Sequence, residues 1–169
     1  MKVVTFNIRC DYGQDGLNEF ANRKELILRK INQEKPDIIG FQEVLPHVAK
    51  WLKENLNEYY VIGCGRGANL RDEQMSIAYR RDRINLISMK TWWLSQTPDV
   101  PGSRYEEQSS CPRTATEAVF EDIKNDKVFR FINTHLDHIG AQAREKGLTQ
   151  IINQLNQERF WKDIPVILC

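Results

Sequence analysis

The sequence lacks the cysteine pattern of a fold that is stabilised by structural zinc or by many disulfides. Its four cysteines are scattered along 169 residues, and no two stand at C-x-x-C spacing. Structural zinc sites usually need such closely spaced thiols, and scattered cysteines in proteins that are not exported are usually free. We therefore expect four free thiols and no structural zinc site.

Long apolar runs and a targeting segment are also missing. No stretch approaches the roughly 18 consecutive apolar residues of a membrane-spanning helix. The first residues lack the apolar region and the small-residue cleavage site of a signal peptide. We therefore expect a cytoplasmic protein without a membrane span.

A strong excess of either charge is absent as well. The chain carries 24 lysines and arginines against 23 aspartates and glutamates, a formal net charge of +1. Proteins that coat long nucleic acid by neutralising phosphates usually show a clear basic excess. Charge balance therefore argues mildly against a stable nucleic-acid coat and is neutral about a small substrate.

The pattern of apolar segments predicts a mixed α/β sandwich in one domain. Strands are expected over residues 3–8, 37–44, 59–63, 75–79, 84–93, 115–121 and 128–136. Some are joined by short polar turns and others by helices, whereas a purely parallel sheet would need a helix between almost every pair. The continuous apolar run at 37–44 is typical of a strand buried on both faces.

Three helices are expected between these strands. The first should begin at an N-cap on Asn22, with Glu25 as its capping-box partner, and end before Pro36. The second should begin near Pro46. The third is predicted over residues 141–159, and four of its apolar residues are expected to face inward: Leu148, Ile151, Ile152 and Leu155.

The last residues, 164–169, have the composition of a core strand that is just beginning. A domain seldom stops inside a buried strand, because the neighbouring strands would be missing and the core left open. We therefore expect an incomplete domain, truncated at its C-terminus.

Three predicted strands are apolar along their length and end in polar residues. They end at Asn7, at Glu43, and at the run of Asn133, His135 and Asp137. Because side chains alternate across a strand, each of these residues continues a row that begins apolar. Such a row is expected where a core face opens into a cleft.

Carboxylate, amide and imidazole groups gathered at one cleft suit Mg²⁺ or Mn²⁺, which prefer oxygen ligands and keep several waters. Zinc would need more histidine or cysteine. Each residue also has a structural interpretation: Asn7 as a turn former, Glu43 as a charge at a helix N-terminus, and His135 as a structural histidine. Asp137 and His138 are equally compatible with capping the following turn.

Five motifs carry a family resemblance. They are TFNIR at residues 5–9, PDIIGFQEV at 36–44, WWLSQTP at 92–98, RTAT at 113–116 and FINTHLD at 131–137. In this order they resemble the endonuclease/exonuclease/phosphatase superfamily, and the similarity runs from residue 3 to residue 169. The resemblance implies a four-layered α/β/β/α sandwich of two mixed sheets.

The resemblance also implies roles for individual residues. Glu43 would be the main protein ligand of Mg²⁺, with Asn7 beside the same ion. His135 would bind a phosphate oxygen and stabilise the transition state, while a water activated by an aspartate attacks phosphorus in line. As substrate-binding residues we expect Arg113, Asn133 and Asp137, whereas Arg66 is more simply interpreted as a surface arginine.

Two family motifs are absent from residues 1–169: Gly-Asp-x-Asn, which carries the base, and a later Ser-Asp-His. Losing a positioned base typically costs about 10²–10⁴-fold in rate. We therefore expect the full-length protein to be an Mg²⁺-dependent phosphoester hydrolase, either a nuclease or other phosphodiesterase or a phosphatase, and this chain alone to be nearly inactive. Its substrate would be nucleic acid, a nucleotide, a phosphorylated sugar or a lipid headgroup. The alternative is a non-catalytic binding or scaffold protein that retains the fold.

Overall fold

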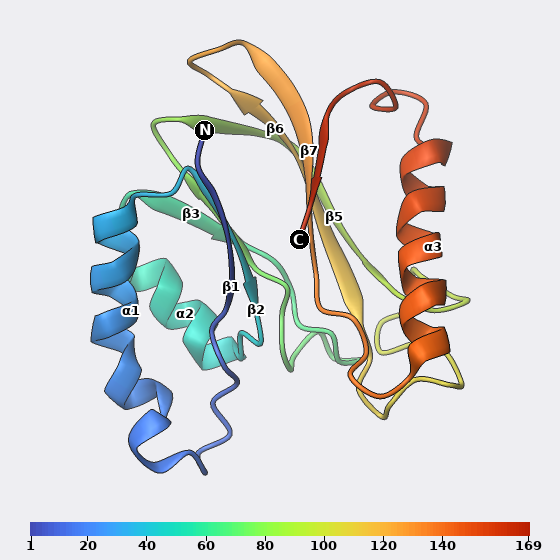
Figure 1. Ribbon diagram of the computed structural model, residues 1–169, viewed down its shortest axis with the longest axis horizontal. Helices are drawn as coiled ribbons and strands as arrows, with labels where there is room; N and C mark the ends of the chain where they lie inside the picture. Colours follow the sequence, from blue (N-terminus) through green and yellow to red (C-terminus); the bar gives the residue numbers. More distant parts are fainter.

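Two four-stranded sheets lie face to face in the computed structural model, which describes residues 1–169 (Figure 1). The first sheet has the order β1-β2-β4-β3, with bounds Val3–Asn7, Ile38–Gln42, Ile77–Arg80 and Tyr59–Ile62. The second has the order β5-β6-β7-β8, with bounds Ile84–Trp93, Thr114–Asp122, Lys127–Thr134 and Val166–Leu168. The β1–β2 and β7–β8 pairs are parallel and the others antiparallel, so both sheets are mixed, as predicted.

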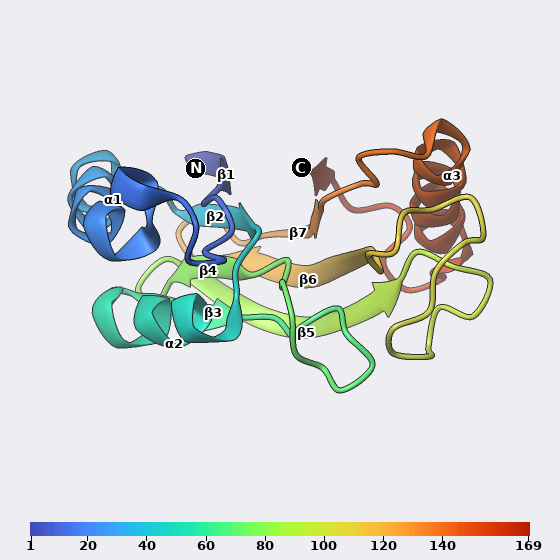
Figure 2. The ribbon, with the colours of Figure 1, turned by 90° about the horizontal axis from the view of Figure 1, so that it is seen from below.

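Helices cover the outer face of each sheet. Helices α1 (Phe20–Glu34) and α2 (Pro46–Asn55) lie on the first sheet, and α3 (Ala141–Gln157) lies on the second. Figures 1 and 2 show α1 and α2 at one side of the molecule and α3 at the other. The four-layered α/β/β/α sandwich is confirmed. A 3₁₀ turn, Gly16–Asn18, precedes α1.

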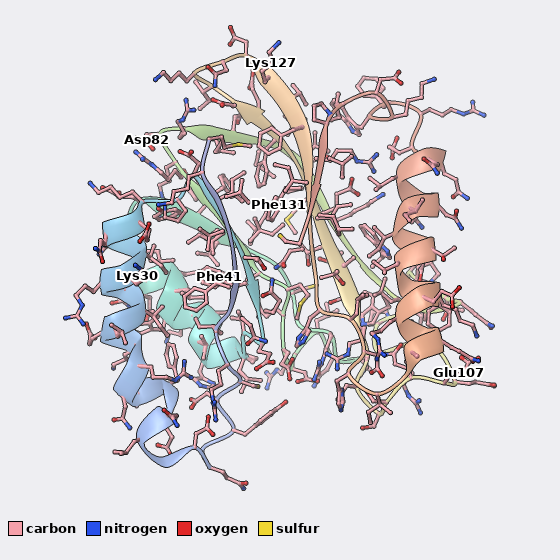
Figure 3. The ribbon with its side chains drawn as sticks, viewed as in Figure 1. Lys30, Phe41, Asp82, Glu107, Lys127 and Phe131 are labelled. Carbon is pink, nitrogen blue, oxygen red and sulfur yellow. The ribbon has the colours of Figure 1, made fainter.

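Three apolar clusters hold the layers together. One lies between α1, α2 and the first sheet, and includes Phe41; another lies between the two sheets, and includes Phe131 (Figure 3). The third joins the second sheet to α3 through Ile132 and Ile151. Burying each such side chain contributes about 1.5–3 kcal/mol, so these clusters fix the spacing of the layers.

Strand β2 is central to the first sheet and explains its apolar run. All five of its residues are buried, because α1 and α2 cover one face and the second sheet covers the other. At Gly40 an added Cβ would lie 3.0 Å from the Asn133 Oδ1 and 3.0 Å from the Cys169 Sγ. Glycine therefore lets the two sheets approach closely here.

The start of α1 differs from the prediction. The helix begins at Phe20, and the Asn22 side chain donates to the Gly16 carbonyl at 3.2 Å, so Asn22 is not the N-cap. Instead the Asp11 Oδ1 accepts from the Phe20 N–H at 3.1 Å. A side chain nine residues upstream thus accepts the hydrogen bond of a backbone N–H in the first turn of α1, for which the neighbouring residues provide no acceptor.

The inward face of α3 is also narrower than predicted. Ile151 is buried, but Leu148 is 38% and Ile152 53% exposed. The helix packs along Ala143, Gly147 and Ile151, which recur every four residues. Gly147 allows α3 to pack closely against Leu94, since an added Cβ would lie 3.1 Å from the Leu94 side chain.

All four cysteines are free thiols. None of the helices combines the length and the apolar character that crossing a membrane requires.

Candidate active site

The polar ends of β1 and β2 meet, as the parallel pairing of these strands requires. The Asn7 Nδ2 donates to the Glu43 Oε1 at 2.8 Å. The backbone N–H of Cys10, in the loop after β1, donates to the Glu43 Oε2 at 2.7 Å. Both carboxylate oxygens are therefore held by neutral N–H groups, and Glu43 forms no ion pair with a lysine or arginine.

Glu43 is half-buried but remains ionised. Burial alone would raise the pKa of its carboxyl group. The hydrogen bonds from Asn7 and Cys10, with the nearby positive charge of Arg113, outweigh burial and hold that pKa below its usual range. The site thus keeps a carboxylate whose charge no side-chain cation neutralises.

The backbone around this carboxylate is strained. Glu43 has a φ of 63° and Arg9 a φ of 64°, both in the left-handed region that favours glycine. Non-glycine residues in this region cost about 1–3 kcal/mol each and gather at functional sites. The turn directs Glu43 out of the line of β2 and toward Asn7.

The donors at this position fit Mg²⁺ or Mn²⁺ better than zinc. Glu43 offers carboxylate oxygens, and the Asn7 Oδ1, which accepts from the Arg9 N–H at 2.9 Å, has a second lone pair. No group of three or more His, Cys, Asp or Glu side chains lies close enough to hold a metal ion. Mg²⁺ accepts one or two protein ligands and completes its shell with water and phosphate, whereas structural zinc needs four.

His135 lies just beyond the end of β7, half-buried. Burial and the neighbouring Arg113 guanidinium lower the pKa of its imidazole, so the ring is neutral at pH 7. Its Nδ1 is buried and has no hydrogen-bond partner in the chain. The structure brings His135 into the same region as Glu43, near enough for the carboxylate charge to act on the pKa of the imidazole.

Arg113 lies directly before β6 and is only 5% exposed. Its Nε lies 3.5 Å from the Asp137 Oδ2, and its Nη2 lies 2.8 Å from the His138 Nδ1. Its charge acts on both Glu43 and His135. The sequence-predicted Arg113 is therefore part of this site.

Asp137 does not face a substrate, contrary to the prediction. It is 3% exposed and accepts from the Ser109 Oγ and from the backbone N–H groups of Ile139 and Gly140. Burial would raise the pKa of Asp137, but these hydrogen bonds dominate and hold it far below its usual range. The alternative that Asp137 caps the following turn is confirmed.

Asn133 is also a structural residue rather than a substrate contact. It is fully buried, and its Nδ2 donates to the carbonyls of Phe41 and Ser76 at 2.7 and 2.9 Å. Its Oδ1 accepts from the Gln42 Nε2 at 2.7 Å. Asn133 therefore ties the second sheet to the first directly behind Glu43.

Sequence reasoning missed a buried ion pair beside the site. Arg66, expected at the surface, is 3% exposed and its Nη2 lies 2.9 Å from the Glu73 Oε1, which also accepts from the Tyr12 hydroxyl at 2.8 Å. The glycines on either side of Arg66 were the available signal. An added Cβ at Gly65 would lie 2.4 Å from the Arg71 carbonyl, so the loop is tightly wound.

A cleft of about 440 Å³ opens beside Asn7 and His135, between the ends of β1, β7 and β8. A larger groove of about 770 Å³ lies along α3 and residues 95–105, but it contains none of the site residues and is lined mainly by exposed polar side chains. The smaller cleft is the one next to the candidate chemistry.

A sandwich with a carboxylate, an amide and an imidazole at its strand ends fits the class of metal-dependent phosphoester hydrolases. Residues 4–169 match the model of the Endonuclease/Exonuclease/phosphatase family, and the chain belongs to this family. An endonuclease/exonuclease/phosphatase from Bacteroides vulgatus is 35% identical with a TM-score of 0.92, over 97% of this chain and 62% of its own. A mannosyl-6-phosphatase from Bacteroides thetaiotaomicron is 31% identical with a TM-score of 0.92, over 99% of this chain and 63% of its own.

Among curated proteins, an uncharacterised protein of Acanthamoeba polyphaga mimivirus is 27% identical over 176 residues, which cover 99% of this chain and 65% of that protein. The chain thus spans 62–65% of the length of these three relatives.

Proposed function

We propose that the full-length protein containing this chain hydrolyses a phosphoester with the help of Mg²⁺ held by Glu43 and Asn7. The observation that carries the proposal is the ionised carboxylate of Glu43. Its backbone is strained, two hydrogen bonds orient its oxygens, and no side-chain cation neutralises its charge. When bound, a divalent ion would supply Lewis-acid polarisation of the phosphoryl group and neutralise the leaving oxygen.

The remaining site residues would bind and orient the phosphate. A neutral His135 can donate one ring N–H to a phosphate oxygen, and Arg113 adds a fixed positive charge next to it. Asp137 contributes indirectly, because it holds the turn that follows His135.

No residue of this chain is assigned as the general base. Asp137, the aspartate nearest to His135 in sequence, is buried and committed to hydrogen bonds. Because a positioned base contributes about 10²–10⁴-fold, we propose that residues 1–169 alone are nearly inactive.

A small substrate is the best first choice, and a phosphorylated sugar should be tested before nucleotides or nucleic acid. The balanced charge of the chain argues against a nucleic-acid coat, and the 31% identical relative is a mannosyl-6-phosphatase.

Metal binding can be tested by thermal unfolding of the 169-residue chain in increasing Mg²⁺. At ten times Kd a ligand that binds only the folded state adds about 1.4 kcal/mol. We expect this gain in the wild type and in Glu54→Gln, which removes an exposed carboxylate of α2, but not in Glu43→Gln. A wild type that responds to neither Mg²⁺ nor Mn²⁺ would favour the non-catalytic scaffold instead.

A further inference from the structure

The Arg113 guanidinium is held on one side by two neighbours from the loop after β7. Its Nε faces the buried Asp137 carboxylate at 3.5 Å but forms no hydrogen bond, and its Nη2 lies 2.8 Å from the His138 Nδ1. Its Nη1 forms no hydrogen bond within the chain. Of its five N–H donors, those on Nη1 and the second on Nη2 therefore remain for a ligand.

The contact with His138 defines the tautomer of that histidine. An arginine side chain always donates, so the His138 Nδ1 must accept and the ring proton must sit on Nε2. Losing this acceptor would leave the Arg113 guanidinium without a hydrogen-bond partner in the chain.

His138 is the one group that accepts a hydrogen bond from the Arg113 side chain. The other titratable groups around Arg113 are Asp137 in the same loop as His138, His135 at the end of β7, and Glu43 at the end of β2. Asp137 is already bound by Ile139, Gly140 and Ser109 and cannot follow a displaced guanidinium.

We infer that His138 is a positioning residue, which together with Asp137 holds the Arg113 guanidinium in place to bind a tetrahedral dianion. This inference rests on the proposed function, because it treats Arg113 as a ligand of the substrate phosphate. His138 itself touches no reacting atom.

Sulfate is the appropriate probe, because it is a tetrahedral dianion whose charge does not change near neutral pH. Its affinity for the 169-residue chain would be measured without Mg²⁺ by isothermal titration calorimetry at pH 8. The variants are His138→Asn, whose amide oxygen can accept from Arg113 and does not ionise, and His138→Ala, which has no acceptor. His47→Asn, an exposed histidine on α2, is the matched control.

At pH 8 we expect wild type, His138→Asn and His47→Asn to bind sulfate equally, and His138→Ala about tenfold more weakly. A His138→Ala variant that binds sulfate like wild type, or a His138→Asn variant that binds it as weakly as His138→Ala, would overturn the inference.

These outcomes are separate from those of the metal test. A chain that gains stability from Mg²⁺ but shows no His138 effect would refute the positioning role and leave the proposed hydrolase intact. A His138-dependent sulfate site in a chain that ignores Mg²⁺ and Mn²⁺ would refute the metal site alone.

Discussion

Replacing Asn133 by leucine should strongly destabilise the fold, because this residue joins the two sheets behind the candidate site. The change keeps the branched shape of the side chain but removes all three hydrogen bonds of the amide, to Gln42, Phe41 and Ser76. The perturbation therefore removes the polar bridge between the sheets.

The structure gives the expected size of the effect. Each lost hydrogen bond contributes about 1 kcal/mol net, which sums to about 3 kcal/mol for the three. Two of the groups that lose Asn133 as a partner keep another hydrogen bond. The Gln42 Nε2 still donates to the Gly40 carbonyl at 3.1 Å, and the Ser76 carbonyl still accepts from the Phe41 N–H at 2.8 Å. These remaining bonds keep the cost from rising far above that sum.

Urea unfolding followed by tryptophan fluorescence would measure the change in the free energy of unfolding. For a chain of this length, about 3 kcal/mol corresponds to a fall in Tm of about 6–12 °C. Asn32→Leu, at an exposed position of α1, is the control and should change stability by less than about 0.5 kcal/mol. If Asn133→Leu behaved like this control, the amide would not be joining the sheets, and our argument for its role would fail.

Two further predictions concern buried charges. Replacing Arg130, which is 1% exposed and lies 2.5 Å from Glu117, by leucine should cost about 3–5 kcal/mol, because it leaves Glu117 buried without its main partner. The Arg130→Leu/Glu117→Leu double variant should recover most of this in the same urea assay; equal losses in both variants would contradict it. The depressed pKa of Asp137 means that its stabilising effect is present above its unfolded pKa of about 4 and is lost as the pH falls below that value. Urea midpoints measured from pH 6 to pH 2.5 should therefore fall less steeply for Asp137→Asn than for wild type, and parallel curves would show that Asp137 contributes nothing to acid unfolding.

The strand ends were predictable from the sequence because their signal is local. An apolar run that turns polar marks where a strand leaves the core, and Asn7, Glu43 and His135 all lie at such points. The register of β1 against β2 then brings Asn7 beside Gln42, so that Glu43 follows within reach of Asn7.

The misplaced residues have one physical cause in common. Strand alternation gives the face of a side chain but not its depth, so Asn133, which faces the first sheet, could not be distinguished from a cleft residue. The cap supplied by Asp11 and the buried pair of Arg66 and Glu73 depend on contacts between loops. Such contacts exist only once the layers have assembled, and spacing along the chain does not encode them.

The left-handed backbone at Glu43 has a consequence for how the protein can change over generations. Glycine at this position would relieve backbone strain of about 1–3 kcal/mol, but it would leave the Asn7 amide and the Cys10 N–H without their acceptor. Selection for stability alone weighs only these two effects, whereas selection for activity requires the carboxylate itself. Position 43 is thus a place where thermostability and chemistry compete for the same side chain.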